Sequence, residues 1–167
     1  HKYGLNGVWG RNINFSIKQS HSNEYGDIGN LTIIENSTGK MAVELAFGIS
    51  TILSRFYKLL HPIQASLINM VFPCDSGFSI KFADAIVVSI LLLKEGIRPT
   101  ASDCRGRILR KYIQSLNYFR SKLGLNFNDL VNIIINYEKL EFGTSSDIAN
   151  KVVNYLKEFE QLLEKGM

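Results

Sequence analysis

The stretch Ile80–Glu95 reads IKFADAIVVSILLLKE and decides the helical half of the fold. Apolar residues occupy almost every side of a helix drawn through it, which is typical of a helix buried at the centre of a domain. Near the N-terminus, Asn12–Lys18 reads NINFSIK, and its alternation of polar and apolar residues predicts a half-buried strand. Strands followed by helices indicate the α+β class. We expect a small mixed sheet from the N-terminal third, packed against several helices.

Three further segments have the composition of regular elements. Leu31–Glu35 is predicted to be a second short strand. Apolar residues recur at helical spacing from Lys40 to Leu60 and predict one long helix there. Ala65–Phe72 is an apolar run of strand length that ends at Pro73. A last short strand is predicted at Lys139–Phe142.

The predicted helix boundaries rest on local capping chemistry. Glycine favours the left-handed conformation that follows a helix, and Ser, Thr, Asn and Asp favour the position that precedes one. The expected C-terminal boundaries are Gly96 and Gly124, and the expected N-terminal boundaries are Ser102 or Asp103, Asn128 or Asp129, and Thr144–Asp147.

Length and composition limit the classes of protein that the chain can belong to. At 167 residues and 46% hydrophobic residues, residues 1–167 fit a single globular domain. Cys74 and Cys104 are isolated, so no disulfide framework is expected and a reducing cytoplasm is the default location. The longest apolar run, Ala85–Leu93, is too short to cross a membrane, and no membrane association is expected.

Much of the net charge of +4 comes from one basic stretch. Such a cluster can face an acidic partner, nucleic acid or another subunit, or can be a solvated helix face with a few ion pairs. The basic stretch consists of Arg98, Arg105, Arg107, Arg110, Lys111, Arg120 and Lys122.

Few other residues point to a ligand. His1, His21 and His61 have no histidine at ligand spacing, so no metal site is predicted. The sequence has no phosphate-binding loop, so no cofactor is expected in this segment. The aromatic residues Tyr3, Trp9 and Phe15 are interpreted as core.

The order of several short motifs resembles the proteolytic domain of Lon-type ATP-dependent proteases over nearly the whole chain. The resemblance is to a pattern that opens with a glycine-containing strand and hairpin, continues through a helix start and a serine-bearing turn, and closes with a capped helix. The stretches that carry it are YGLNGVWG at 3–10, GDIGNLTI at 26–33, GKMAVELA at 39–46, VFPCDSGFS at 71–79, IVVSIL at 86–91, RGRIL at 105–109, LEF at 140–142 and 147–156.

This resemblance implies a Ser–Lys peptidase. It implies a C-terminal domain excised from a longer protein, with ATP bound in a separate AAA+ domain, a protein or peptide substrate and a homo-oligomeric ring. Ser79 follows a glycine by two residues and is predicted as the nucleophile, with Ser76 as the alternative. Lys111 is predicted as the base, although the family's lysine position falls on Gln114 or Ser115. A serine needs such a base because its hydroxyl is otherwise a weak nucleophile.

Two other functions follow from the departures from the pattern. The first is a catalytically inactive Lon-like module that mediates oligomerisation or binds a protein partner or nucleic acid. Serine at either position is then an ordinary helix cap. The second sets the family aside, because the helical half also resembles a four-helix module of toxin and nucleotide-associated proteins. That half lacks the R-x-x-x-x-H signature of the nuclease forms.

Overall fold

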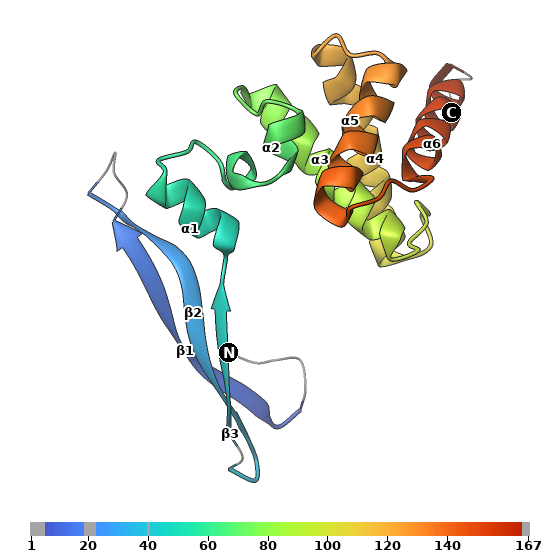
Figure 1. Ribbon diagram of the computed structural model, residues 1–167. Coiled ribbons are helices and arrows are strands. Elements are labelled where there is room, and N and C mark those ends of the chain that lie inside the picture. The colour runs from blue at the N-terminus through green and yellow to red at the C-terminus, as the bar shows by residue number, and fades with distance from the viewer. Residues whose placement is uncertain (1–5, 19–22, 40, 165–167) are drawn as a thin grey trace. The chain divides into compact units, whose positions relative to one another are not determined.

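The computed structural model describes residues 6–18, 23–39 and 41–164, and the side chains up to residue 161. It confirms the α+β class. By its contacts the chain, expected as one domain, divides into two compact units, residues 1–65 and 66–167. Figure 1 shows the strands in the first unit and the longest helices in the second.

The first unit contains an antiparallel sheet of three strands. These are β1 (Val8–Lys18), β2 (Tyr25–Asn36) and β3 (Met41–Phe47), with β2 in the middle. The register of β1 shifts between Phe15 and Ser16, which marks a bulge. Helix α1 (Ile49–Phe56) follows and contacts β2, and the 3₁₀ helix η1 (Pro62–Ala65) contacts α1.

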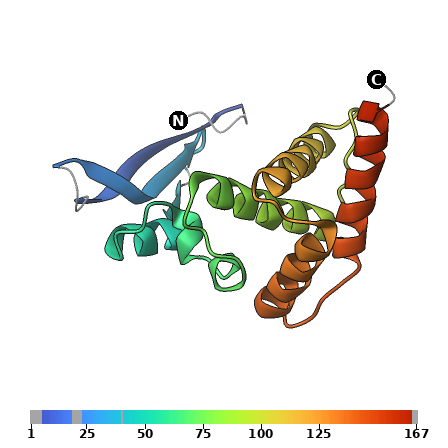
Figure 2. The ribbon, with the colours of Figure 1, turned by 90° about the horizontal axis from the view of Figure 1, so that it is seen from above.

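The second unit is helical. It contains the short α2 (Ile68–Val71) and four longer helices, α3 (Gly77–Lys94), α4 (Cys104–Lys122), α5 (Phe127–Phe142) and α6 (Ile148–Glu164). Figure 2 shows α6 beside α4 and α5, and it contacts both. The core of this unit is apolar, as the period of each helix predicts. Its largest fully buried apolar side chains are Ile68, Phe82, Ile86, Ile90, Leu109, Leu116, Leu130, Ile134, Val152 and Leu156.

Three predicted elements are wrong. The helix expected from Lys40 to Leu60 is strand β3 followed by α1, because the segment after Gly39 pairs with β2. The run Ala65–Phe72 is helical in short pieces and not a strand. The strand expected at Lys139–Phe142 is the last turn of α5, which ends at Gly143 in the left-handed conformation.

Most of the predicted boundaries are confirmed. Asp103 caps α4 by accepting a hydrogen bond from the Gly106 amide at 2.8 Å. Gly96 and Gly124 follow their helices with φ of 78° and 68°. Helix α5 begins slightly earlier than expected, with Asn126 as its N-cap and Asp129 reaching back to the Asn126 amide.

Gly106 is required by a close approach between α4 and the segment before it. A Cβ atom there lies 2.6 Å from the Arg98 carbonyl oxygen and 2.8 Å from Thr100 Oγ1. We expect Gly106→Ala to reduce the free energy of unfolding by about 1–2 kcal/mol, since overpacking outweighs the gain of roughly 1 kcal/mol in helix propensity. Gly77→Ala is the matched control, because no atom lies within 4 Å of that Cβ. Denaturant unfolding followed by circular dichroism measures both, and equal stability of the two variants contradicts the prediction.

Candidate functional site

Ser79 lies at the start of α3 and is engaged in capping that helix. Its amide donates to Ser76 Oγ at 3.1 Å, and the Ser76 amide donates to Ser79 Oγ at 2.8 Å. The Ser79 hydroxyl lies 3.0 Å from the Ser76 carbonyl oxygen and 3.4 Å from Asp75 Oδ1. The side chain is 2% exposed. This reciprocal pairing is a capping box, which satisfies amides at the helix start.

Lys111 is exposed in the middle of α4, and the structure does not bring its amine to Ser79. The start of α3 meets α4 near Phe119, whose ring centroid is 6.2 Å from that of Phe78. Lys111 precedes Phe119 by eight residues, which is roughly 12 Å along a helix axis. In the described part of the chain, no lysine forms a hydrogen bond with Ser76 or Ser79.

Cys74, next to this turn, is also unsuited to nucleophilic chemistry. It is 2% exposed, and burial, with a smaller contribution from the charge of Asp75, raises the pKa of its thiol to about 11. The thiolate is the nucleophilic form, so a thiol with this pKa is almost fully protonated at neutral pH.

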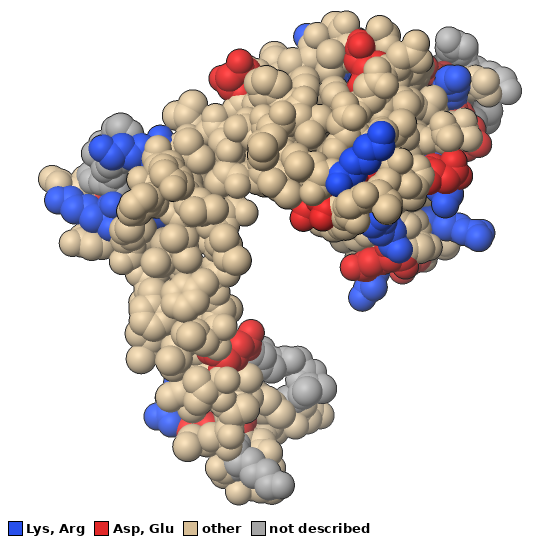
Figure 3. Space-filling view, in the orientation of Figure 1, with Lys and Arg blue, Asp and Glu red and all other residues tan. Residues whose placement is uncertain are grey.

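The basic stretch is spread over α4 and the segment before it, and part of it is paired. Arg120 Nη2 lies 3.1 Å from Glu160 Oε1, and its guanidinium lies 4.1 Å from the centroid of the Phe127 ring. Arg105 lies 4.0 Å from Glu95. On the face of this unit drawn in Figure 3, basic and acidic side chains are mixed. The mixed charges on this face therefore do not create the single-sign field that attracts nucleic acid.

One face of the sheet in the first unit is apolar on all three strands. Since side chains alternate along a strand and the register pairs Ile13 with Leu31 and Leu31 with Leu45, these residues lie on one face. This surface, called the apolar sheet face below, also carries a stacked pair of rings, Phe15 and Phe47, with centroids 5.4 Å apart. Its members are Trp9, Ile13, Phe15, Leu31, Ile33, Met41, Val43, Leu45 and Phe47.

The apolar sheet face is open to solvent. Met41 and Val43 are each 66% exposed, and Ile13 is 63% exposed. The expectation that Trp9 and Phe15 are core residues is wrong, because they are 42% and 37% exposed on this open face. Tyr3 lies outside the described residues. No apolar side chain of the described strands is buried.

Gly29 lets the two rings of this face lie against the middle strand. A Cβ atom at Gly29 would overlap Phe47 Cδ1 and the Ala46 carbonyl oxygen. The absence of a side chain at this position therefore allows Phe15 and Phe47 to stack across β2.

The charged residues at one end of the apolar sheet face neutralise each other. Glu35 Oε2 accepts a hydrogen bond from Trp9 Nε1 at 2.8 Å, and Glu35 Oε1 pairs with Arg11. The hydrogen bonds from Trp9 and Arg11 lower the pKa of Glu35. The face therefore presents no net charge from its strand residues.

The opposite face of the sheet is more polar, although Val8, Ile34, Ala42 and Ala46 also lie on it. Asp27 accepts hydrogen bonds from Asn14 Nδ2 at 2.9 Å and from Ser16 Oγ at 2.6 Å. Thr32 and Glu44 pair in register on this same face. The two faces thus differ in chemistry although both belong to one thin sheet.

Sequence reasoning missed the apolar sheet face because it assigned the third strand to a helix. The signal was present in MAVELAF at 41–47, where large apolar residues alternate with Ala and Glu. The same segment also continues the helical spacing that leads into α1, and only its pairing with β2 selects the strand.

Comparison of the chain with protein-family models, with curated proteins and with solved structures found no match. Within the described ranges, no three or more His, Cys, Asp and Glu side chains gather as a metal ion would need. Of the candidate histidines, only His61 belongs to these ranges. None of the helices described here is long and apolar enough to cross a membrane.

Proposed function

We propose that the chain is a non-catalytic assembly module in which the apolar sheet face binds the same face of a second copy. The observation that carries the proposal is that the large apolar side chains of this face on β1 and β3 remain between 37% and 66% exposed, while Leu31 and Ile33 of the central strand are half-buried between them. Stable domains bury a sheet face against a second layer. The three strands provide one layer, and a second copy supplies the other.

The area of the face supports a second copy as the occupant. Half-exposed apolar and aromatic side chains of this size together offer on the order of 700 Å² of surface. A stable interface buries about 800 Å² on each partner. The face is therefore of the size that a specific dimer interface needs.

Charge supports the same occupant. Because Arg11 and Glu35 pair with each other, the face has no excess charge that selects a strongly basic or acidic partner. A neutral apolar face is complementary to itself, and a two-fold axis places the same patch on both copies. Two sheets packed in this way lie about 10 Å apart.

The mass of the full chain in solution tests the proposal. Sedimentation equilibrium is expected to give a mass near twice the 18.9 kDa of one chain, falling toward a single chain on dilution. A mass of one chain at every concentration up to ~100 µM overturns the proposal, because an interface of standard size is populated there.

We also expect the assembled protein to be inert to a serine-directed covalent probe. The Ser79 hydroxyl is buried and bonded within the capping box, so it has neither a base nor access. Intact mass spectrometry, with Ser79→Ala and Ser76→Ala as controls, is expected to find no adduct. A single adduct that disappears in one of these variants favours the Ser–Lys peptidase expected from the family resemblance.

A further inference from the structure

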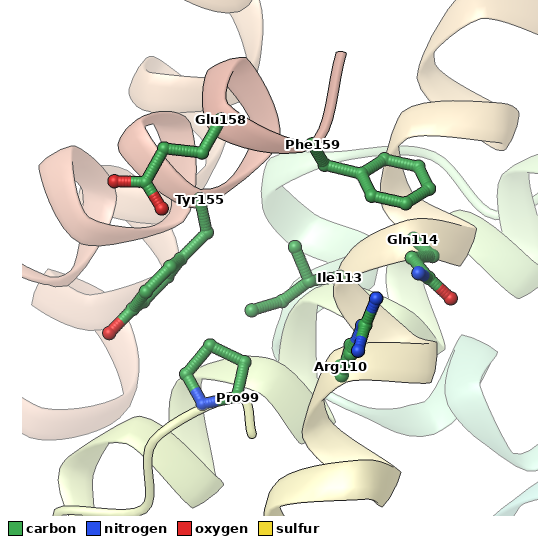
Figure 4. A pocket seen from close by; sticks show the side chains of 7 residues that line it. All are labelled: Pro99, Arg110, Ile113, Gln114, Tyr155, Glu158 and Phe159. Atoms are coloured by element: carbon green, nitrogen blue, oxygen red, sulfur yellow. The ribbon is translucent and has the colours of Figure 1, made fainter. Parts of the chain in front are cut away.

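A pocket lies in the helical unit between α4, α6 and the segment that leads into α4. Its volume is about 220 Å³. Figure 4 shows Tyr155 and Glu158 on one wall, Arg110 and Gln114 on the other, and Ile113 between them. All of these elements belong to the second unit.

The base of the pocket is apolar. Ile113 is 3% exposed, and Pro99 and Phe159 are half-buried beside it. Tyr155 contributes a half-buried aromatic ring. Ligand sites commonly combine such an apolar lining with a few polar groups that fix orientation.

The polar side chains that line the pocket do not pair with each other. Arg110 and Glu158 come from facing helices, yet they form no ion pair within 4.0 Å in the part of the chain that the structure describes. The Gln114 side chain also forms no hydrogen bond with another described residue. The pocket therefore offers one cation and one anion on opposite walls, separated by apolar surface.

We propose that this pocket binds a small zwitterion, a free α-amino acid with an apolar side chain. The Arg110 guanidinium receives the carboxylate, for which its forked donors are suited, and Glu158 receives the ammonium group. The apolar side chain lies against Ile113 and Phe159.

The volume selects a ligand of this size. It is below the ~300 Å³ at which pockets for drug-sized ligands begin. The pocket is also open to solvent on the side of the exposed Arg110 and Glu158 side chains. A wholly apolar molecule would pair with neither Arg110 nor Glu158, whereas a small zwitterion can pair with both.

Isothermal titration calorimetry of the full chain with L-leucine tests the proposal. Millimolar or tighter binding is expected, and two analogues remove one charge each. Leucine amide lacks the carboxylate and N-acetyl-leucine lacks the ammonium group, and each is expected to bind at least about tenfold more weakly. Equal binding of either analogue overturns the zwitterion assignment, as does no heat of binding by leucine up to ~10 mM.

Arg110→Gln and Glu158→Gln identify the site. Both residues are exposed, so the variants are expected to fold, and each should weaken leucine binding at least about tenfold. Lys111→Gln is the matched control, since Lys111 is the exposed neighbour of Arg110 on α4 and does not line this pocket. Binding that survives both pocket variants, or falls equally with Lys111→Gln, overturns the assignment.

Discussion

Val43→Lys is expected to convert the assembled protein into single chains. Val43 lies at the middle of β3 on the apolar sheet face and is 66% exposed in one chain. In a two-fold dimer the substitution places two unpaired ammonium groups in an apolar interface, which is costly because a buried charge needs a partner. We expect the dissociation constant of the dimer to rise at least a hundredfold, which corresponds to a loss of roughly 3 kcal/mol of association free energy. Sedimentation equilibrium measures the change.

Ala42→Lys distinguishes assembly through the apolar sheet face from assembly by strand pairing along the β3 edge. Ala42 is the exposed neighbour of Val43 on the same edge strand, but it pairs with Ile34 and lies on the opposite face. If the interface is the apolar sheet face, Ala42→Lys keeps the mass of the dimer. Loss of assembly in both variants indicates pairing along the β3 edge, and retention in Val43→Lys removes the sheet from the interface.

Local sequence patterns predicted the helix boundaries but not the third strand, on which Ala42 and Val43 lie. Local signals predicted an N-cap at Ser102 or Asp103 and helix ends at Gly96 and Gly124, because a cap acts through its own backbone or an amide three residues away. MAVELAF at 41–47 fits both the helical and the strand period, and the choice between them depends on its pairing with Leu31 and Ile33 of β2. That pairing is a tertiary effect, which overrides local propensity.

The features of the candidate site also differ in how far local sequence could predict them. A serine before an apolar helix is typical of an N-cap, and Ser76 caps α3 while Ser79 completes a capping box with it. Whether a lysine reaches that serine depends on how α3 and α4 pack, which no local pattern contains. The apolar sheet face depends on the register of three strands, and the pocket beside Arg110 depends on how α4 meets α6. The sequence supplied the residues of these sites, and packing supplied their proximity.

Glu138→Ala is expected to destabilise the helical unit by about 3 kcal/mol. Glu138 is fully buried on α5 and accepts hydrogen bonds from Ser146 Oγ at 2.6 Å and the Ser146 amide at 3.3 Å. Its carboxylate lies 3.6 Å from Lys94 Nζ, at the end of α3. The Ser146 hydroxyl in turn accepts from the Ile148 amide at 3.4 Å, at the start of α6.

Alanine removes the group on which these three helices converge. Breaking a buried, hydrogen-bonded charge pair leaves its donors unsatisfied and costs about 3–5 kcal/mol, with the lower figure expected because Lys94 is 31% exposed and recovers water. Denaturant unfolding followed by the helical circular dichroism signal measures the loss.

Asn136→Ala, an exposed position on the same helix, is expected to change stability by less than ~0.5 kcal/mol. Glu138→Gln keeps the size and one acceptor and should lie between the two, because it removes the charge that faces Lys94 and one of the two acceptors for Ser146. A loss below ~1 kcal/mol for Glu138→Ala would mean that the buried carboxylate is compensated by water and does not join α3, α5 and α6.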